Sequence, residues 1–306
     1  MERQYKDFLS GYRCWEEAEH AEQWLVFPEN MGARLSIDET SLSDGELYTV
    51  VTNKDAHGGK GALVAIIFGT KAEVVEAALD HIPEELRETV EEITLDLSSS
   101  MGHIVRMEFT KASKVIDRFH IQKLANDAIQ EIRIGHRWEA IKAEHERKLG
   151  DKETGEVLPP EVFANGDTRP QLLARSRYLL FKSADKWTES QKVRAKILFE
   201  QYPDIHEAYW LAHSLRMIFS KCPRRSLAAT RLAKWYVEVE DSGFDSFKVI
   251  ARTFFDHETE ILNFFDNHST NASAESFNSK IKNFRAQLRG VSDTTYFLFR
   301  LQNIYA

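Results

Sequence analysis

Residues 34–68 read RLSIDETSLSDGELYTVVTNKDAHGGKGALVAIIF, and the pattern of these residues predicts the fold class. It holds three runs rich in β-branched and aromatic residues, at positions 34–38, 47–52 and 62–68. A glycine-rich segment, 53–61, separates the second run from the third and is typical of a turn. The three runs therefore predict three consecutive antiparallel strands.

Helices alternate with strands after this stretch. The spacing of apolar residues predicts a helix over 71–82, which Pro83 would end. A buried strand is predicted at 92–97, a short helix over 101–109 and a last strand at 114–117. The order β-β-β-α-β-α-β is that of an RNase H-like fold, an α/β fold with a mixed five-stranded sheet whose last strands are parallel and joined by helices.

The rest of the chain has a helical pattern, interrupted by a loop rich in glycine and proline between 150 and 170. We expect four parts: an N-terminal helical segment at 1–32, the first part of the RNase H-like core at 33–135, a large all-α insertion domain at 136–262, and C-terminal helices at 263–306 that complete the core.

Composition excludes several classes of protein. The chain has 306 residues, of which 42% are hydrophobic and 29% charged, so it should fold as an ordinary globular protein. Two distant cysteines, Cys14 and Cys222, provide neither a disulfide framework nor a cysteine-rich zinc site. No apolar run approaches the roughly 20 residues of a membrane span, and the first residues do not form a signal peptide. We therefore expect a cytoplasmic protein.

Charge is unevenly distributed. The net charge of -8 argues at first against nucleic acid as a partner. However, residues 38–100 hold fourteen acidic and four basic residues, whereas residues 170–235 hold thirteen basic and five acidic residues. This pattern fits a protein that binds cations at one place and phosphates at another, and it fits two solvated surfaces equally well.

Three acidic positions are candidates for chemistry. Asp38 lies inside the first predicted strand and Asp96 inside the fourth, and the interior of a strand disfavours aspartate unless it has a function. Strands one and four are neighbours in an RNase H-like sheet, so the two carboxylates could meet. Glu275 begins a late helix, and Asn278 shares its face at i+3. A strand aspartate is otherwise a cap or turn residue, and a helix glutamate is otherwise solvated.

The helix that carries Glu275 is also basic. Lys280, Lys282 and Arg285 follow Glu275 on this helix. A carboxylate beside basic residues suits a site that holds metal and DNA backbone together, so we predict that these three residues support the site or contact DNA.

Four motifs resemble those of DDE-type bacterial insertion-sequence transposases, in the branch related to Mutator-like elements. They are Asp38-Glu-Thr, the Asp96 strand, KVIDRFH at 114–120, and TNASAESFNSKIK at 270–282. The resemblance covers almost the whole chain, and it implies that Asp38, Asp96 and Glu275 are the catalytic, metal-binding carboxylates. The family often has Glu-Gly-x-Asn at the third position, whereas this chain has Glu-Ser-Phe-Asn.

Asp117 and His120 resemble the family's C/D-x-x-H motif. They could support the site or touch DNA. Alternatively, Asp117 is a helix N-cap beside a packed His120. A rival assignment makes Asp117 the second metal ligand in place of Asp96. We prefer Asp96 as this ligand, because its position matches the motif.

The resemblance implies the function and the partners. The resemblance implies a metal-dependent reaction in which two Mg2+ or Mn2+ ions support cleavage and strand transfer. The substrate would be double-stranded DNA, at the element ends and at the target. The protein would act as a homodimer and be associated with the bacterial nucleoid when bound to DNA. Only 37 residues precede Asp38, without a Cys/His cluster. Terminal-repeat recognition would then come from a separate polypeptide or from the insertion, or be missing. The alternatives are a structure-specific nuclease without strand transfer and a transposase-derived DNA-binding protein.

The insertion contains further candidates for DNA contact. They are basic residues that are otherwise solvated: Arg175, Arg177, Lys192, Arg194, Lys196, Arg224 and Arg225. Aromatic residues at helical spacing favour a core, although an exposed one could contact unpaired DNA. They are Trp138, Trp187, Tyr209, Trp210, Trp235 and Tyr236.

Overall fold

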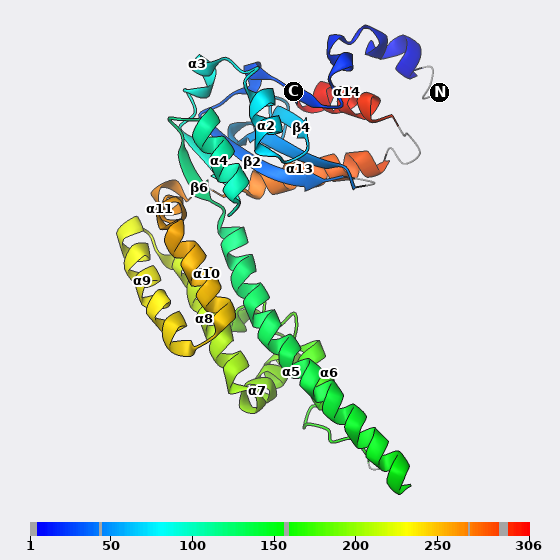
Figure 1. Cartoon of the computed structure of the whole chain (residues 1–306), viewed down its shortest axis with the longest axis vertical. Helices are drawn as coiled ribbons and strands as arrows, with labels where there is room; N and C mark the ends of the chain where they lie inside the picture. Colours follow the sequence, from blue (N-terminus) through cyan, green and yellow to red (C-terminus); the bar gives the residue numbers. More distant parts are fainter. Residues whose placement is uncertain (1–4, 43–44, 156–158, 269, 288–292) are drawn as a thin grey trace. The chain divides into compact units, whose positions relative to one another are not determined.

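A mixed sheet with the strand order β1-β4-β3-β2-β5-β6 forms the first part of the computed structural model (Figure 1). The structure describes residues 5–42, 45–155, 159–268, 270–287 and 293–306. The strands are β1 (Trp24–Val26), β2 (Arg34–Ser41), β3 (Leu47–Asn53), β4 (Leu63–Phe68), β5 (Glu92–Leu95) and β6 (Ser113–Ile116). The predicted α/β class is confirmed.

The directions of the strands follow from their connections. β2, β3 and β4 are antiparallel neighbours, because short turns join them. β5 pairs parallel with β2, and β6 pairs parallel with β5, because helices provide the crossovers. Residues 63–67 of β4 are all buried, as expected of a strand covered on both faces.

The prediction of five strands was wrong by one. Trp24–Val26 lies within the segment 1–32 that was expected to be helical, yet it forms β1 on the outer edge of β4. Pairing with β4 satisfies backbone groups that an open sheet edge would leave exposed, and this gain overrides local helical preference. The segment otherwise contains short turns of helix: η1 (Tyr5–Leu9), η2 (Tyr12–Cys14), η3 (Glu16–Glu19) and η4 (Pro28–Asn30).

Two helices connect the parallel strands, and two later ones complete the core. α2 (Ala72–Leu79) packs against β1, β4 and α4, and α4 (Ser99–Glu108) packs against β5; the short α3 (Glu84–Arg87) lies between them in sequence. From the far end of the chain come α13 (Ala272–Gln287) and α14 (Thr294–Tyr305). Their apolar residues, including Phe277, Ile281 and Phe297, share a core cluster with Leu25, Val50 and Ile66 of the sheet.

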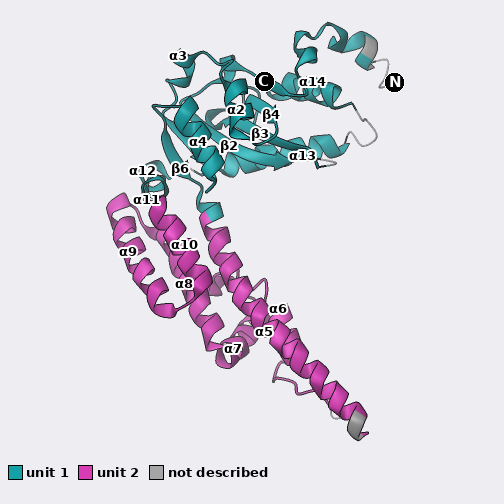
Figure 2. Ribbon diagram, viewed as in Figure 1, with its two compact units in different colours: residues 1–120, 259–306 teal, residues 121–258 magenta. Residues whose placement is uncertain are grey.

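The chain divides into two compact units, residues 1–120 with 259–306 and residues 121–258 (Figure 2). The expected boundaries of the insertion were 136 and 262. The helix α5 (Arg118–Thr154) starts in the first unit and continues into the second.

The second unit is helical in the part of the chain that is described. After α5 it contains α6 (Arg169–Arg175), η7 (Ala184–Lys186), α7 (Glu189–Gln201), α8 (Pro203–Lys221), α9 (Arg225–Ser242) and α10 (Asp245–Asp256). α11 (Glu258–Leu262) begins at its last residue, and α12 (Phe264–Asn267) belongs to the first unit. No helix among the described residues is long and apolar enough to cross a membrane.

Candidate functional site

Three aspartates lie at one level of three neighbouring parallel strands. Ser36 of β2 pairs with Thr94 of β5. Two residues further along each strand, this register brings Asp38 level with Asp96. The register of β5 with β6 likewise brings Asp96 level with Asp117. β5 ends at Leu95, so Asp96 directly follows the strand rather than lying inside it. The sheet therefore brings the three carboxylates level with one another, one within β2 and the others directly after β5 and β6.

α13 adds a fourth carboxylate and an amide. Phe277 and Ile281, four residues apart, are buried in the core cluster beside the sheet and fix the rotation of the helix. Asn278 is buried, and its Nδ2 donates a hydrogen bond to Asp38 Oδ2 at 2.7 Å. Glu275 lies one turn earlier and is half-buried.

His120, in the first turn of α5, lies between two of the aspartates. Its Nδ1 is 2.6 Å from Asp96 Oδ1 and 3.5 Å from Asp117 Oδ2. Burial lowers the pKa of His120, but the hydrogen bonds with Asp117 and Asp96 outweigh burial and raise it to about 10. The imidazole is therefore a cation that offsets part of the negative charge here.

Asp96 acts on the pKa values of both Asp38 and Glu275. Burial, followed by repulsion from Asp96, raises the pKa of Asp38 to about 6. Burial, followed by repulsion from Asp117 and partly offset by His120, raises the pKa of Glu275. Carboxylates that repel one another in a partly desolvated place would be stabilised by a further cation.

The donor atoms suit a hard divalent cation, because carboxylate oxygens are the ligands that Mg2+ and Mn2+ prefer. Within the described ranges, however, no group of three or more His, Cys, Asp or Glu side chains is arranged to hold a metal ion. In this arrangement Asp96 contacts His120, and Asp38 accepts a hydrogen bond from Asn278. The carboxylate oxygens of these residues are suitable ligands for such a cation. In this structure, however, Asp96 and Asp38 are paired with His120 and Asn278.

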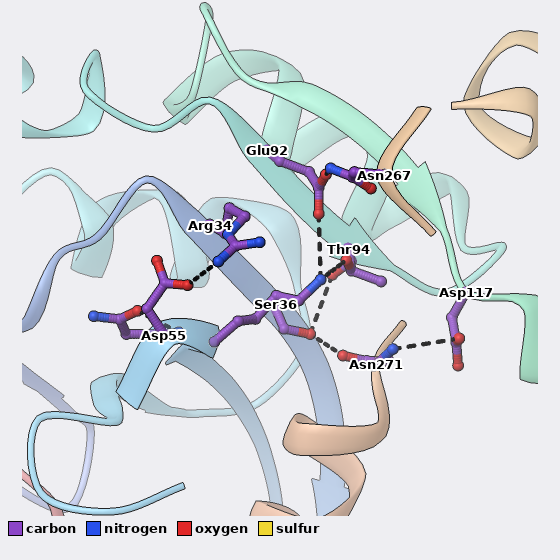
Figure 3. A network of polar contacts seen from close by, with 10 residues as sticks. Arg34, Ser36, Asp55, Glu92, Thr94, Asp117, Asn267 and Asn271 are labelled. Carbon is purple, nitrogen blue, oxygen red and sulfur yellow. Dashed lines mark hydrogen bonds and ion pairs between the residues drawn. The ribbon is translucent and has the colours of Figure 1, made fainter. Parts of the chain in front are cut away.

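A buried polar network connects the start of α13 to the strands (Figure 3). Asn271 is fully buried directly before α13, and its Oδ1 accepts a hydrogen bond from the Ser36 hydroxyl. The backbone N–H of Asn271 donates to Asp117 Oδ1 at 3.5 Å. Ser36 Oγ also donates to the Thr94 carbonyl at 3.3 Å. Asn271 thus connects α13 with β2 and with the end of β6.

The same network continues to a buried ion pair. Lys54 Nζ lies 3.2 Å from Glu92 Oε1 and donates to Thr94 Oγ1 at 2.7 Å. Asn267, at the end of α12, donates its amide to Glu92 Oε2. These contacts hold the segment before Glu275 against β5, so they position the site without being part of it.

The basic residues after Glu275 do not join the carboxylates. Lys280 Nζ donates to the Gly58 carbonyl at 2.8 Å, and Lys282 is exposed. Arg285 is 7% exposed and binds Glu46, with Nη2 at 2.9 Å from Oε1 and Nε at 3.2 Å from Oε2. Arg285 therefore helps to hold α13 in the fold.

Several basic residues of the insertion are already paired. Arg175 and Arg194 both bind Asp167, which is fully buried, and Lys192 binds Glu189. Trp235 is buried, as a core residue should be, whereas Trp138 and Trp210 are 66% and 53% exposed.

Sequence reasoning gave no role to Ser36, Thr94 or Asn271. A signal was present: Ser36 and Thr94 are small polar residues two positions before Asp38 and Asp96, so they share the faces of those aspartates. Asn271 stands in the quoted motif, but its partners become visible only when the strands are paired.

We expect Asn271→Ala to lower the free energy of unfolding by about 1–3 kcal/mol, because the buried Ser36 hydroxyl loses its Asn271 acceptor and is left with the 3.3 Å bond to the Thr94 carbonyl. In urea unfolding, the double variant with Ser36→Ala should lose less than the sum of the single losses, by at least about 0.5 kcal/mol. Ser279→Ala is a matched control, since its exposed hydroxyl donates to the carbonyl of Glu275 on its own helix. Strictly additive losses would contradict a direct bond between Ser36 and Asn271.

Comparison with known proteins supports the resemblance to insertion-sequence transposases. A family described as transposase, the ISL3 group, matches residues 35–301. The chain therefore belongs to the ISL3 transposase family. It is 25% identical over 252 residues to the transposase for insertion sequence element IS1557 from Mycobacterium tuberculosis, in both strain CDC 1551 / Oshkosh and strain ATCC 25618 / H37Rv.

The aligned segment is 81% of this chain and 54% of each relative, so the chain spans about half the length of the curated relatives it matches. No solved structure matches it significantly. The matching family is ISL3, whereas the sequence motifs had suggested a Mutator-related branch.

Proposed function

We propose that this chain is the catalytic part of a DDE-type transposase that cuts and joins DNA at the ends of an insertion sequence. The observation that carries the proposal is the grouping of Asp38, Asp96 and Glu275, which lie far apart in sequence. Burial and repulsion from Asp96 both contribute to the raised pKa values of Asp38 and Glu275. Membership of a transposase family supports it.

We further propose that the first unit is an RNase H-like core. The antiparallel strands β4, β3 and β2, followed by the parallel strands β5 and β6, have the order that the sequence predicted for such a core. β1 is an addition at the edge. The helices of residues 121–258 would be the insertion that separates Asp96 from Glu275 in sequence.

Asp38, Asp96 and Glu275 would hold two Mg2+ or Mn2+ ions. When bound, these ions would lower the pKa of an attacking water or 3′-hydroxyl and offset charge on the leaving oxygen. Asn278 orients the Asp38 carboxylate through its hydrogen bond. For Asp96 to serve as a ligand, His120 must release the contact that it makes here.

Asp117 and His120 are proposed to position the site, which gives the D-x-x-H motif a role. Asp117 is 2% exposed, and it meets His120 on one oxygen and the backbone of Asn271 on the other. It therefore connects the helix that carries Glu275 with the histidine that contacts Asp96. The motif's link to a Mutator-related branch is part of the same proposal.

The proposed partner is double-stranded DNA, at the element ends and at the target. We also propose that the chain works as a homodimer, because two element ends must be joined in one event.

The test uses a labelled duplex that contains an element end, a supercoiled target plasmid, and Mg2+ or EDTA. We expect a cut at the end and a joined product in the plasmid, both only with Mg2+. Cutting without joining would instead identify a structure-specific nuclease. Salt-dependent binding without any cutting would identify a transposase-derived DNA-binding protein, and either result would overturn the proposal.

A further inference from the structure

A cavity of about 760 Å³ in the helical unit brings several arginines together. Arg133, Arg137 and Trp138 of α5 line it, together with Arg177 from the segment after α6. Positions 133 and 137 are one helical turn apart, so they share a face of α5. A cavity of this size is within the range of small-ligand sites.

Arg133 is a buried charge whose hydrogen-bond partners, among the described residues, are neutral. It is 4% exposed, its Nε donates to Gln130 Oε1 at 2.7 Å, and its Nη1 donates to the Leu173 carbonyl at 2.8 Å. Burial lowers the pKa of Arg133, and the positive charges of Arg137 and Arg177 lower it further. A buried charge normally has a counter-ion, and this one has positive neighbours instead.

Two acidic residues also line the cavity, but they leave the arginines uncompensated. Asp127 and Glu131 are exposed on α5. Within the described part of the chain, no carboxylate lies within ion-pair distance of Arg133, Arg137 or Arg177. The balance at the cavity remains positive, so an external anion would be attracted.

An exposed aromatic ring stands beside these charges. Trp138 is 66% exposed and directly follows Arg137. Proteins bind single-stranded nucleic acid with an exposed aromatic ring next to guanidinium groups, since the charges bind phosphates and a base stacks on the ring. Here the guanidinium groups have no carboxylate partner among the described residues. Bases inside a duplex are stacked on one another and do not offer a free face.

We propose that this cavity binds an unpaired stretch of DNA, with phosphates held by Arg137 and Arg177 over the buried Arg133 and with one base stacked on Trp138. The inference adds a second DNA site to the proposed function. It rests on that function only for the choice of DNA as the nucleic acid.

The test measures binding of a fluorescein-labelled 15-nucleotide poly-dT strand and of a labelled 15-base-pair duplex to the full chain in EDTA. Trp138→Ala should weaken binding of the single strand about tenfold or more and binding of the duplex less than about twofold. Arg137→Ala should weaken binding of both and reduce the salt dependence by about one charge. Both side chains are exposed, so the fold should survive, which circular dichroism checks.

Trp210→Ala is the matched control, because Trp210 is another exposed tryptophan of the same unit, and it should change affinity less than about twofold. Unchanged binding of poly-dT to Trp138→Ala, or an equal loss in Trp210→Ala, would overturn the inference. Displacement of poly-dT by poly-glutamate with the same dependence on Trp138 would assign the cavity to an acidic peptide, which also overturns it. EDTA prevents metal-dependent cleavage, so these binding results do not depend on it. The inference about the cavity can therefore be refuted without refuting the proposed function, and the reverse.

Discussion

Replacing Asp38 with asparagine is expected to lower metal-dependent DNA cleavage by at least about a thousandfold, while the chain remains folded. Asn278 donates to Asp38 Oδ2 at 2.7 Å, and an asparagine oxygen can still accept that bond. The shape is therefore kept, and the negative charge that a hard divalent cation needs is lost. Glu275→Gln should have the same effect for the same reason.

The same variant should be more stable than the native chain without metal. Burial and repulsion by Asp96 raise the pKa of Asp38 to about 6, so the folded chain binds more protons than the unfolded chain between the ordinary carboxyl pKa and about pH 6. Stability falls as the pH rises through this window. Asp38→Asn removes this penalty and should gain about 1–3 kcal/mol at pH 7 in EDTA.

Three measurements check this pair of effects: cleavage of an element end, Mn2+ binding followed by electron paramagnetic resonance, and thermal unfolding with and without Mg2+. Asp80→Asn is the control, since Asp80 is exposed at the end of α2, and it should leave cleavage and Mn2+ binding unchanged. Native-level cleavage by Asp38→Asn would refute its role as a metal ligand. A destabilised metal-free variant would refute the electrostatic account.

Replacing Asp167 with alanine is expected to destabilise the helical unit by about 3 kcal/mol, since removing one partner of a buried ion pair leaves charges uncompensated. Asp167 is fully buried and accepts hydrogen bonds from Arg175, from Arg194 Nε at 2.9 Å and from Asn165 Nδ2 at 2.8 Å. It thereby connects the start of α6 with α7. Partial exposure of Arg175 places the loss at the lower end of the usual range.

The pH dependence has a definite sign. Burial raises the pKa of Asp167, but the hydrogen bonds from Arg194 and Arg175 outweigh burial and bring the pKa below its ordinary value. The stabilisation is therefore present above the unfolded pKa of about 3.9 and is lost as the pH falls through the lower folded pKa. The difference between native chain and variant should be constant from pH 7 to 5 and shrink only below about pH 4.

Urea unfolding followed by tryptophan fluorescence tests this, because four of the six tryptophans lie within residues 121–258. Glu189→Ala is the control: its ion pair with Lys192 is exposed and should contribute less than about 0.5 kcal/mol. A loss as small as that of the control would show that the Asp167 cluster is not structural.

The sequence alone predicted the strands β2 to β6 and most helices, because apolar periodicity and turn residues are local signals. It also predicted that the segments carrying Asp38 and Asp96 are neighbours, since the order of strands and crossover helices limits the topology. It could not predict β1. The gain there comes from pairing with an exposed edge of β4, which is a distant segment.

Charge compensation was likewise decided by the tertiary structure. In the sequence, a basic residue that contacts DNA looks the same as one that is paired inside the fold. In the structure, Asp167 neutralises Arg175 and Arg194, and Glu46 neutralises Arg285. Arg133 has no such partner among the described residues. The periodicity of the chain determined which segments form strands and helices, whereas packing between distant segments determined which charges remain available, because the energy of a charge depends on its neighbours in space.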